Sequence, residues 1–182
     1  LDVTSDDDWA AARDWVSREW GRLDVLVNNA GIAIGGRIDV TTMDEWRKGI
    51  DVNLLGVARG CHTFAGMLKA QRSGHIVNVA SLAGLVHGPA MAPYNAAKAG
   101  VVALSEPLDY ELTPFGVRTS VVCPAFFRTN LAASMIGSDP ALEKVTARLI
   151  DESPRSADDI AAVVMAGIDQ GLQRHRGESR CP

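Results

Sequence analysis

A tyrosine and a lysine stand four residues apart in the segment APYNAAKAG, residues 92–100. The alanine-rich composition predicts a helix, in which residues i and i+4 lie on one face. Tyr94 and Lys98 should therefore point the same way, among small neighbours that let another molecule approach closely. An ammonium held near a phenol favours the phenolate, so the pair could act as a general base. Taken alone, such a pair is more often a surface tyrosine beside a solvated lysine. Other residues of the chain must therefore show whether this pair is catalytic.

Two further polar residues, Ser81 and Asn53, are candidates for chemistry. Ser81 ends an apolar run and precedes Tyr94 by 13 positions. It could bind a substrate oxygen, cap the following turn, or act as the nucleophile of a hydrolase with His87 as its base. No G-x-S-x-G sequence surrounds Ser81, which argues against the hydrolase. Asn53 lies within a predicted helix, where asparagine is disfavoured and usually faces solvent.

Composition limits the class of protein. With 182 residues, of which 47% are apolar, the chain is expected to form one domain with a hydrophobic core. A net charge of −4 gives no indication of nucleic acid or an anionic membrane as a partner. No apolar run reaches membrane-spanning length, and no signal peptide is recognisable. The three cysteines form no closely spaced pair and the four histidines show no ligand spacing, which predicts a reduced, cytoplasmic protein without a metal site.

Three short apolar runs predict strands buried on both faces of a parallel sheet: LDVLVNNAG at 23–31, HIVNVAS at 75–81 and VRTSVVCPA at 117–125. Helical patterns alternate with them at 5–20, 42–69, 94–113 and 156–171. Three of these helices have a predicted N-cap, at Ser5, Thr42 and Ser156. The first helix should place an apolar stripe in the core, formed by Trp9, Ala12, Val16 and Trp20.

This alternation predicts an α/β fold of the doubly wound, Rossmann-like type. Ligands of such folds bind beyond the carboxyl ends of the strands, where the polar residues of this chain collect. Residues 1–171 are expected to form the domain, and residues 172–182 a polar, disordered tail. Residues 130–155, with weak helical signals, are interpreted as a long irregular segment that acts as a lid over the substrate. Pro107 should kink the helix at 94–113.

Five motifs in order resemble those of the short-chain dehydrogenase/reductase family: NNAG (28–31), DVNLLG (51–56), IVNVAS (76–81), YNAAK (94–98) and CPAFFRT (123–129). The separation of Ser81 and Tyr94 is also the usual one in that family. The resemblance covers residues 1–170. It implies an oxidoreductase that transfers a hydride between a nicotinamide cofactor, NAD or NADP, and an alcohol or ketone, here a small apolar one.

The resemblance implies a role for each matching residue. Tyr94 would exchange a proton with the substrate oxygen, Ser81 would hydrogen-bond that oxygen, and Lys98 would hold the nicotinamide ribose. Lys98 would also lower the pKa of Tyr94, and a lowering by ~2 to 3 units corresponds to roughly 3 to 4 kcal/mol. Asn53 would hold a water that links Lys98 to solvent. The other implied cofactor contacts are Asp2 and Val3 at the adenine ring, Asn29, Ala30 and Gly31 along the adenosine, and Pro124, Phe127 and Thr129 near the nicotinamide.

The chain departs from the family pattern in two places. The glycine-rich phosphate loop expected after the first strand is absent, since GIAIGG at 31–36 does not open a helix with G-x-G-x-x-G spacing. Ala125 follows Pro124 where the family usually has glycine. The chain is therefore expected to be a fragment that lacks the first strands and the last strand, and to be inactive as written. The alternative is a non-catalytic binding or regulatory relative without a phosphate loop, against which the intact catalytic residues argue.

Family members commonly associate through two helices related by a two-fold axis. The resemblance therefore implies a homodimer or homotetramer, formed through the helices at 42–69 and 94–113. The segment DVLVN, residues 24–28, is expected to form an unprotected edge of the sheet in this chain.

Overall fold

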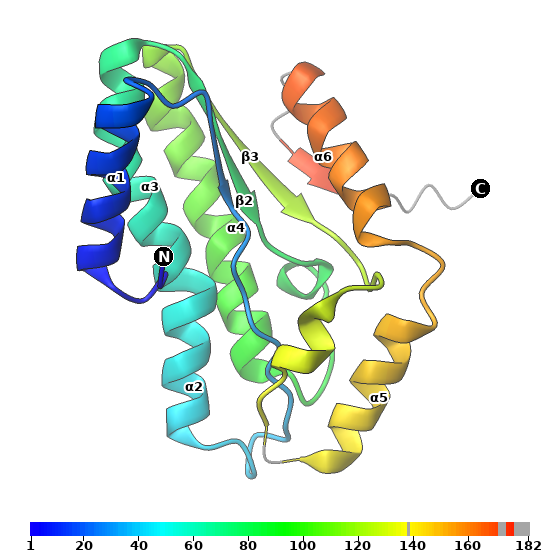
Figure 1. Ribbon diagram of the computed structural model, residues 1–182. Helices are drawn as coiled ribbons and strands as arrows, with labels where there is room; N and C mark the ends of the chain where they lie inside the picture. Colours follow the sequence, from blue (N-terminus) through cyan, green and yellow to red (C-terminus); the bar gives the residue numbers. More distant parts are fainter. Residues whose placement is uncertain (138, 171–173, 177–182) are drawn as a thin grey trace.

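Four parallel strands form one sheet in the computed structural model, which describes residues 1–137, 139–170 and 174–176 (Figure 1). The strands lie in chain order and are β1 (Val25–Asn28), β2 (Gly74–Val79), β3 (Val117–Cys123) and β4 (Arg174–Arg176). Asn28 lies opposite Asn78 in the pairing of β1 with β2, and Val79 lies opposite Val122 in the pairing of β2 with β3. The predicted α/β fold with a parallel sheet is confirmed, as are the three predicted strands.

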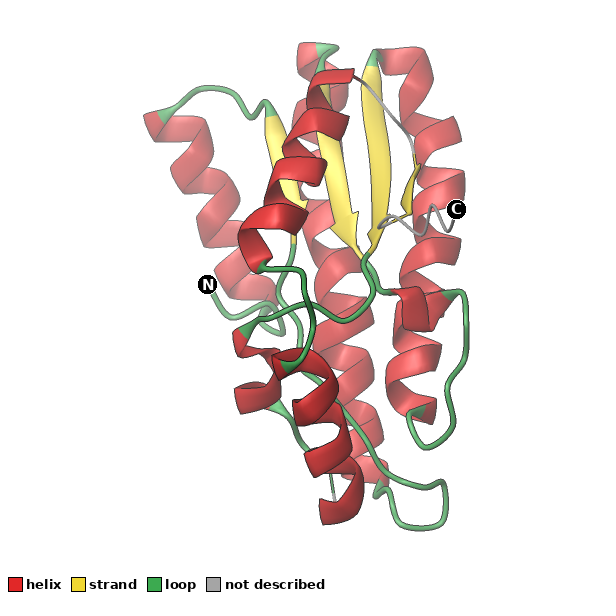
Figure 2. Cartoon of the chain, turned by 90° about the vertical axis from the view of Figure 1, so that its right-hand side faces the viewer, coloured by secondary structure: helices red, strands yellow, loops and turns green. Residues whose placement is uncertain are grey.

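Helices lie on both sides of the sheet. The helices α1 (Asp6–Glu19), α3 (Gly56–Gln71) and α4 (Ala92–Leu112) lie on one side, and α6 (Ala157–Gln170) lies on the other (Figures 1 and 2). The helices α2 (Met43–Ile50) and α5 (Pro140–Asp151) lie beyond the carboxyl ends of the strands (Figure 1). Shorter turns are η2 (Leu82–Gly84), η3 (Thr113–Phe115) and η4 (Asn130–Ser134). The core between the sheet and the first group of helices includes Phe64, Leu68, Ile76, Leu112 and Val117, all buried.

Side-chain caps start the helices where the sequence predicts them. The N–H of Asp8 donates to Ser5 Oγ at 3.1 Å at the start of α1. Thr42 and Glu45 each accept a hydrogen bond from the other's backbone N–H, which forms a capping box before α2. Ser156 caps α6 in the same manner. These bonds satisfy N–H groups that the first turn of a helix leaves without a partner.

The predicted helix at 42–69 contains a π-helical turn. Residues Asp51–Leu55 form this turn, η1, between α2 and α3, and the N–H of Gly56 bonds to the carbonyl of Asp51. A π turn holds one residue more per ring than an α turn, and such turns occur mostly at functional sites. Asn53 lies within it with 0% of its surface exposed, so it is not the solvated residue that is usual inside a helix.

The end of the first helix differs from the prediction. α1 ends at Glu19, and Trp20 follows as its C-cap with 60% of its surface exposed. Trp9 and Val16 are buried as predicted, but the placement of Trp20 in the core was wrong. Gly21, with a φ of 69°, turns the chain away directly after the helix. The Trp20 ring therefore packs on the edge of a neighbouring exposed tryptophan rather than on the sheet.

Two predictions for the C-terminal part were also wrong. Residues 130–155 are not irregular, because they contain η4 and α5. Arg174–Arg176, predicted to lie in a disordered tail with the last strand missing, form β4 and pair with Val121 to Cys123 of β3. Local signals are weak in both segments, and contacts with the rest of the chain decide their structure. The domain boundary predicted at 171 and 172 lies outside the described residues. α4 continues through Pro107 as one helix.

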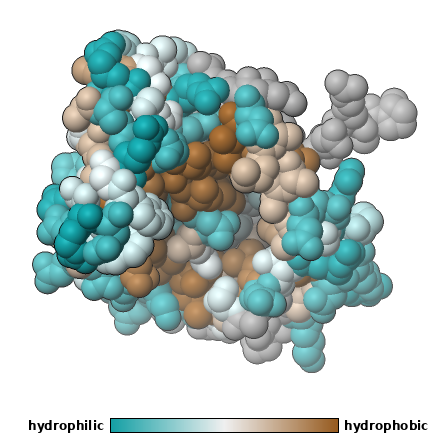
Figure 3. All heavy atoms as spheres, turned by 45° about the horizontal axis from the view of Figure 1, so that its top comes forward, coloured by the Kyte–Doolittle hydropathy of each residue, from teal (hydrophilic) through white to brown (hydrophobic). Residues whose placement is uncertain are grey.

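β1 forms one edge of the described sheet. Leu26 and Asn28 are buried on the side that contacts α3, whereas Val27 on the opposite side is 48% exposed. The strand is therefore covered on one face, and the prediction of burial on both faces was wrong for β1. Figure 3 shows apolar residues lining a hollow in the face turned toward the viewer, with polar residues around it.

Candidate active site

A cavity of about 620 Å³ lies where the strands end. Its walls come from the segments that follow β1, β2 and β3, from α4, and from residues between 130 and 150. It brings together most of the predicted site residues: Asn29, Ala30, Gly31, Asn53, Ser81, Tyr94, Lys98, Pro124, Phe127 and Thr129. Asp2 and Val3 are not among the residues that line it.

The Ser81 side chain lies close enough to the Tyr94 hydroxyl to lower the pKa of the phenol. Ser81 follows β2 directly, and Tyr94 lies in the first turns of α4 with 7% of its surface exposed. Ser81 Oγ also accepts the N–H of Ala83 at 3.2 Å, so it caps η2 as well. The interpretation of this serine as a cap of the next turn is therefore confirmed.

Lys98 lies one turn after Tyr94 and is 4% exposed. Its Nζ donates to the carbonyl of Val79 at 2.9 Å and lies 5.8 Å from the centre of the Tyr94 ring. Burial lowers the pKa of Lys98 to about 8, because the ammonium loses its hydration. The site therefore contains a buried lysine that titrates much closer to neutral pH than an exposed one.

Burial raises the pKa of Tyr94, and the nearby Ser81 side chain opposes this rise. The sequence argument expected a Tyr94 pKa lowered by the Lys98 ammonium together with a positively charged nicotinamide, and that expectation stays a prediction. The physical reason for the rise is that a phenolate in the buried site loses its hydration, while the Lys98 Nζ is bonded to Val79 and lies beside the ring. A lowered Tyr94 pKa requires a further positive charge in the cavity.

Asn53 is bound to the loop that follows β1. Its Nδ2 donates to the carbonyl of Ile32, and its Oδ1 accepts the Ile32 N–H, both at 2.9 Å. Gly31 lies beside this pair: a Cβ at Gly31 would be 3.0 Å from Asn53 Oδ1 and 3.6 Å from Lys98 Nζ. The absence of a side chain at Gly31 therefore lets the Asn53 amide and the Lys98 ammonium both lie close to this glycine.

The segment predicted as a lid, residues 130–155, is attached to the loop after β1. The N–H of Ile136 bonds to the carbonyl of Ala33 at 3.0 Å, and the N–H of Gly35 bonds to the carbonyl of Ile136 at 3.3 Å. Arg37 of the same loop forms an ion pair of 2.9 Å with Asp139, which is 7% exposed. Leu131, Ser134, Thr146 and Ile150 line the cavity. The segment thus forms one wall of the site, held there through the tip of the loop after β1.

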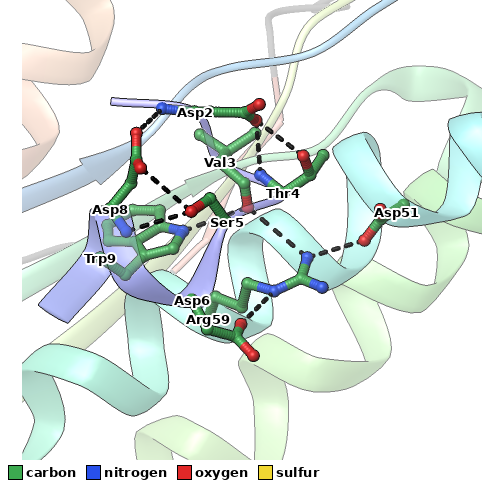
Figure 4. Close-up of polar contacts among 9 residues, drawn as sticks. All are labelled: Asp2, Val3, Thr4, Ser5, Asp6, Asp8, Trp9, Asp51 and Arg59. Atoms are coloured by element: carbon green, nitrogen blue, oxygen red, sulfur yellow. Dashed lines mark hydrogen bonds and ion pairs between the residues drawn. The ribbon is translucent and has the colours of Figure 1, made fainter.

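The N-terminal residues form a polar cluster of their own (Figure 4). Asp2 accepts hydrogen bonds from the backbone N–H of Thr4 at 2.9 Å and from its hydroxyl at 2.7 Å. The carbonyl of Val3 accepts the indole N–H of Trp9 at 3.1 Å and a guanidinium N–H of Arg59 at 3.5 Å. Arg59 also pairs with Asp6 and Asp51, each at 2.7 Å. The turn that contains Asp2 and Val3 is thereby fixed to α1, to α3 and to the π turn that carries Asn53.

Sequence reasoning missed Arg59 and Asn95. Nothing in the sequence pairs Arg59 with residues as far away as Asp6. Asn95 is 6% exposed, lines the cavity beside Tyr94 and donates from Nδ2 to the carbonyl of Gly88 at 2.8 Å. The one local signal was an asparagine among the alanines of a helix, where this residue is disfavoured.

The described residues include neither a metal-binding cluster nor a membrane-spanning helix. Among residues 1–137, 139–170 and 174–176, no three His, Cys, Asp or Glu side chains are grouped as a metal ion would require. No helix within these ranges is both long enough and apolar enough to cross a membrane.

The comparisons with known proteins agree on one family. Residues 1–138 match the family model described as short chain dehydrogenase. The chain is 38% identical over 135 residues to trans-4-hydroxycyclohexanecarboxylate dehydrogenase of Sinomonas cyclohexanicum, covering 74% of this chain and 52% of that protein. It is 40% identical over 146 residues to inactive 2-(S)-hydroxypropyl-CoM dehydrogenase 2 of Xanthobacter autotrophicus, covering 78% of this chain and 63% of that protein.

The solved structures agree with the sequence comparison. A short-chain dehydrogenase/reductase of Burkholderia phymatum, crystallised in complex with NAD, superposes with a TM-score of 0.93 at 30% identity. The match covers 98% of this chain and 69% of that one. The chain thus spans less than two thirds of the length of the curated relatives named above, whereas nearly all of its own length matches a solved relative.

Proposed function

Because the chain belongs to the short-chain dehydrogenase family, we propose that its residues catalyse hydride transfer between a nicotinamide cofactor, NAD or NADP, and a small apolar alcohol or ketone. One observation supports this proposal above the others. Ser81, which follows β2, meets Tyr94 and Lys98 of α4 at one buried cavity, and the Ser81 side chain lies close enough to the Tyr94 hydroxyl to lower its pKa. The match to a solved relative in complex with NAD supports the cofactor class.

The cavity fits the nicotinamide and its ribose. The buried ammonium of Lys98 has three N–H groups, and the bond to Val79 uses one, so it can donate to two ribose hydroxyls. Pro124, Phe127 and Thr129 line the same cavity and would contact the nicotinamide. Asn29, Ala30 and Gly31 would contact the adenosine, and Asp2 and Val3 would contact the adenine outside the cavity. The cofactor would accept or supply the hydride.

The residues of the chain would transfer the proton of the reaction. The Ser81 hydroxyl would hydrogen-bond the substrate oxygen and hold it beside the Tyr94 hydroxyl. Tyr94 would take the proton of an alcohol, or donate one to a ketone. Its raised pKa favours the donor form in the chain alone, and the positive charges of Lys98 and of an oxidised nicotinamide would favour the phenolate. Asn53 would hold a water next to Lys98, through which protons reach solvent.

We retain a non-catalytic binding or regulatory protein as the alternative. The sequence contains no glycine-rich phosphate loop, and one relative is named as an inactive dehydrogenase. The arrangement of a serine and a tyrosine beside a buried lysine supports the enzyme, because a protein that only binds has no need of a proton donor there. We further propose that residues 130–155 act as the lid of the substrate site, and that the protein is cytoplasmic, in keeping with the buried thiol of Cys61.

The lining of the cavity suggests a test of the substrate. Among the described residues that line it, Lys98 alone is charged. A carboxylate on the substrate would be buried without a partner, which costs several kcal/mol. We therefore expect kcat/KM for cyclohexanol to exceed that for trans-4-hydroxycyclohexanecarboxylate by about 10² or more, since 1.4 kcal/mol corresponds to a factor of ten.

The two alcohols differ by one carboxylate group, so each serves as the control for the other. Initial rates would be measured from the absorbance of the reduced cofactor, with NAD and NADP in turn, using protein expressed from the complete coding sequence. A kcat/KM for trans-4-hydroxycyclohexanecarboxylate that equals or exceeds the value for cyclohexanol would show that a cation outside the described lining reaches the substrate. Loss of turnover with every alcohol and both cofactors would favour the non-catalytic alternative.

We also propose that the protein is a homodimer or homotetramer formed through the helices at 42–69 and 94–113. Exposed side chains on the outer side of this region include the apolar Leu55 and the aromatic Tyr110, which is 79% exposed. Light scattering at micromolar concentration should therefore give twice or four times the monomer mass. The mass of a single chain under these conditions would contradict the proposal.

A further inference from the structure

The segment that follows Ser81 approaches α4 more closely than a side chain would allow. Gly84, at the end of η2, is buried against the backbone of α4 at Lys98. A Cβ at Gly84 would lie 2.6 Å from the carbonyl oxygen of Lys98 and 3.0 Å from the N–H nitrogen of Ala99. The glycine is therefore required for direct contact between this turn and the helix that carries the catalytic tyrosine and lysine.

The far end of the same segment is held on the same helix by a side chain. Asn95 Nδ2 donates to the carbonyl of Gly88 at 2.8 Å. The orientation of this amide follows from its partner, because a carbonyl accepts hydrogen bonds and only Nδ2 can donate one. As a consequence the Asn95 Oδ1 is buried with no hydrogen-bond partner among the described residues.

A buried acceptor without a partner makes the folded protein less stable, and an apolar residue of similar size avoids that loss. Asn95 therefore contributes something other than stability. Its hydrogen bond and the contact at Gly84 attach the segment between Ser81 and Met91 to α4 at two points. These points lie on either side of Leu85 and Val86, in the part of the segment that borders the cavity.

We propose that Gly84 and Asn95 are positioning residues that hold the Ser81 hydroxyl against the Tyr94 hydroxyl. The inference rests on the proposed function, because it assigns these two residues to the same reaction. Neither touches the reacting atoms. The close contact at Gly84 sets the distance between the turn after Ser81 and α4. The Asn95 bond prevents the remainder of the segment, which forms part of the cavity wall, from moving away from the helix.

The first test replaces Asn95 with leucine, which has a similar size and no polar atoms. Gly88 is exposed, so its carbonyl can bond to water instead. We expect kcat to fall by about tenfold, while the melting temperature stays the same or rises because the unpartnered acceptor is gone. If Asn95 had only a structural role, its replacement would not lower kcat while the melting temperature stays the same or rises. Hydrogen exchange followed by mass spectrometry should show faster exchange of the amides of residues 82–91 only.

The second test replaces Gly84 with alanine, which forces the turn away from the helix backbone. We expect kcat to fall by about 10², with a smaller change in KM, because the reacting groups are misplaced while the apolar cavity wall remains. Gly66→Ala is the matched control, since a Cβ at Gly66 would meet no atom within 4 Å. If the Gly84→Ala protein does not fold, the kcat and exchange rates of Asn95→Leu still test the positioning role.

Two outcomes separate this inference from the proposed function. If the unsubstituted protein oxidises alcohols but Asn95→Leu keeps its kcat and its exchange rates, the positioning role is wrong. If the unsubstituted protein oxidises no alcohol with either cofactor, the proposed function fails. The exchange of residues 82–91 then still shows whether Asn95 holds the segment, because that measurement needs no turnover.

Discussion

Replacing Tyr94 with phenylalanine should lower kcat by on the order of 10³. The substitution removes one oxygen atom, which is the group placed beside Ser81 to exchange a proton with the substrate. Phenylalanine keeps the ring that packs in the first turns of α4, where Tyr94 is 7% exposed. The loss should therefore appear in kcat rather than in folding. Steady-state rates and far-UV circular dichroism of the same preparation would measure both.

The chain contains one other tyrosine, which supplies a matched control. Tyr110 lies on the same helix and is 79% exposed. Tyr110→Phe removes the same atom from the surface and should leave kcat within a factor of two. Near-normal turnover by Tyr94→Phe would show that another group transfers the proton, and the assigned chemistry would have to be abandoned.

Replacing Lys98 with methionine should lower kcat by on the order of 10² and weaken cofactor binding. Methionine fills a similar volume but removes the buried ammonium that favours the Tyr94 phenolate and would donate to the ribose. The KM for the cofactor should rise together with the fall in kcat, in contrast to Tyr94→Phe. Lys48→Met, at an exposed position of α2, is the control. A Lys98→Met protein with unchanged KM for the cofactor would exclude the ribose contact.

The same variant should change how stability depends on pH. The pKa of Lys98 is lowered from 10.5 to about 8 by burial, so between these values the unfolded chain binds more protons than the folded one. The free energy of unfolding should therefore rise with pH in this window, and the full effect corresponds to about 3 kcal/mol. Tyr94, whose pKa is raised, acts in the opposite direction above pH 10.

Urea unfolding of the unsubstituted protein and of Lys98→Met, compared from pH 7 to pH 10, would measure this effect. The free energy of unfolding of Lys98→Met should exceed that of the unsubstituted protein most at pH 7. The difference between the two proteins should shrink as the pH rises. A difference that does not vary with pH would mean that Lys98 keeps an ordinary pKa.

The sequence predicted those features whose signal is local. Strands at β2 and β3 follow from runs of valine and isoleucine, and helix starts follow from Ser5, Thr42 and Ser156. The approach of Tyr94 to Lys98 follows from helical spacing alone. Ser81 came from its distance along the chain in a family pattern, and it lines the same cavity as Tyr94 in the structure.

The features that the sequence did not predict depend on distant parts of the chain. Gly84 looks like any loop glycine until the backbone of Lys98 is placed beside it. The helix in residues 130–155 has weak local signals and is held by contacts such as that of Arg37 with Asp139. The burial that raises the Tyr94 pKa in the chain alone was also not predicted, because the degree of burial around a phenol cannot be read from a pair of residue types.

The π turn at Asp51–Leu55 makes the number of residues in this helix as important as their identity. If one residue between Thr42 and Gly56 were deleted, the wide turn could close as an ordinary α turn, because a π turn accommodates one extra residue; α2 and α3 would keep their relative orientation, but the residues of the turn itself would change position. Asn53 would then no longer face Ile32. Substitutions on the outer surface of α2 leave that geometry intact, whereas a deletion of one codon anywhere in the stretch alters it. Over the course of divergence this helix should therefore accept changes of residue while its length stays constant.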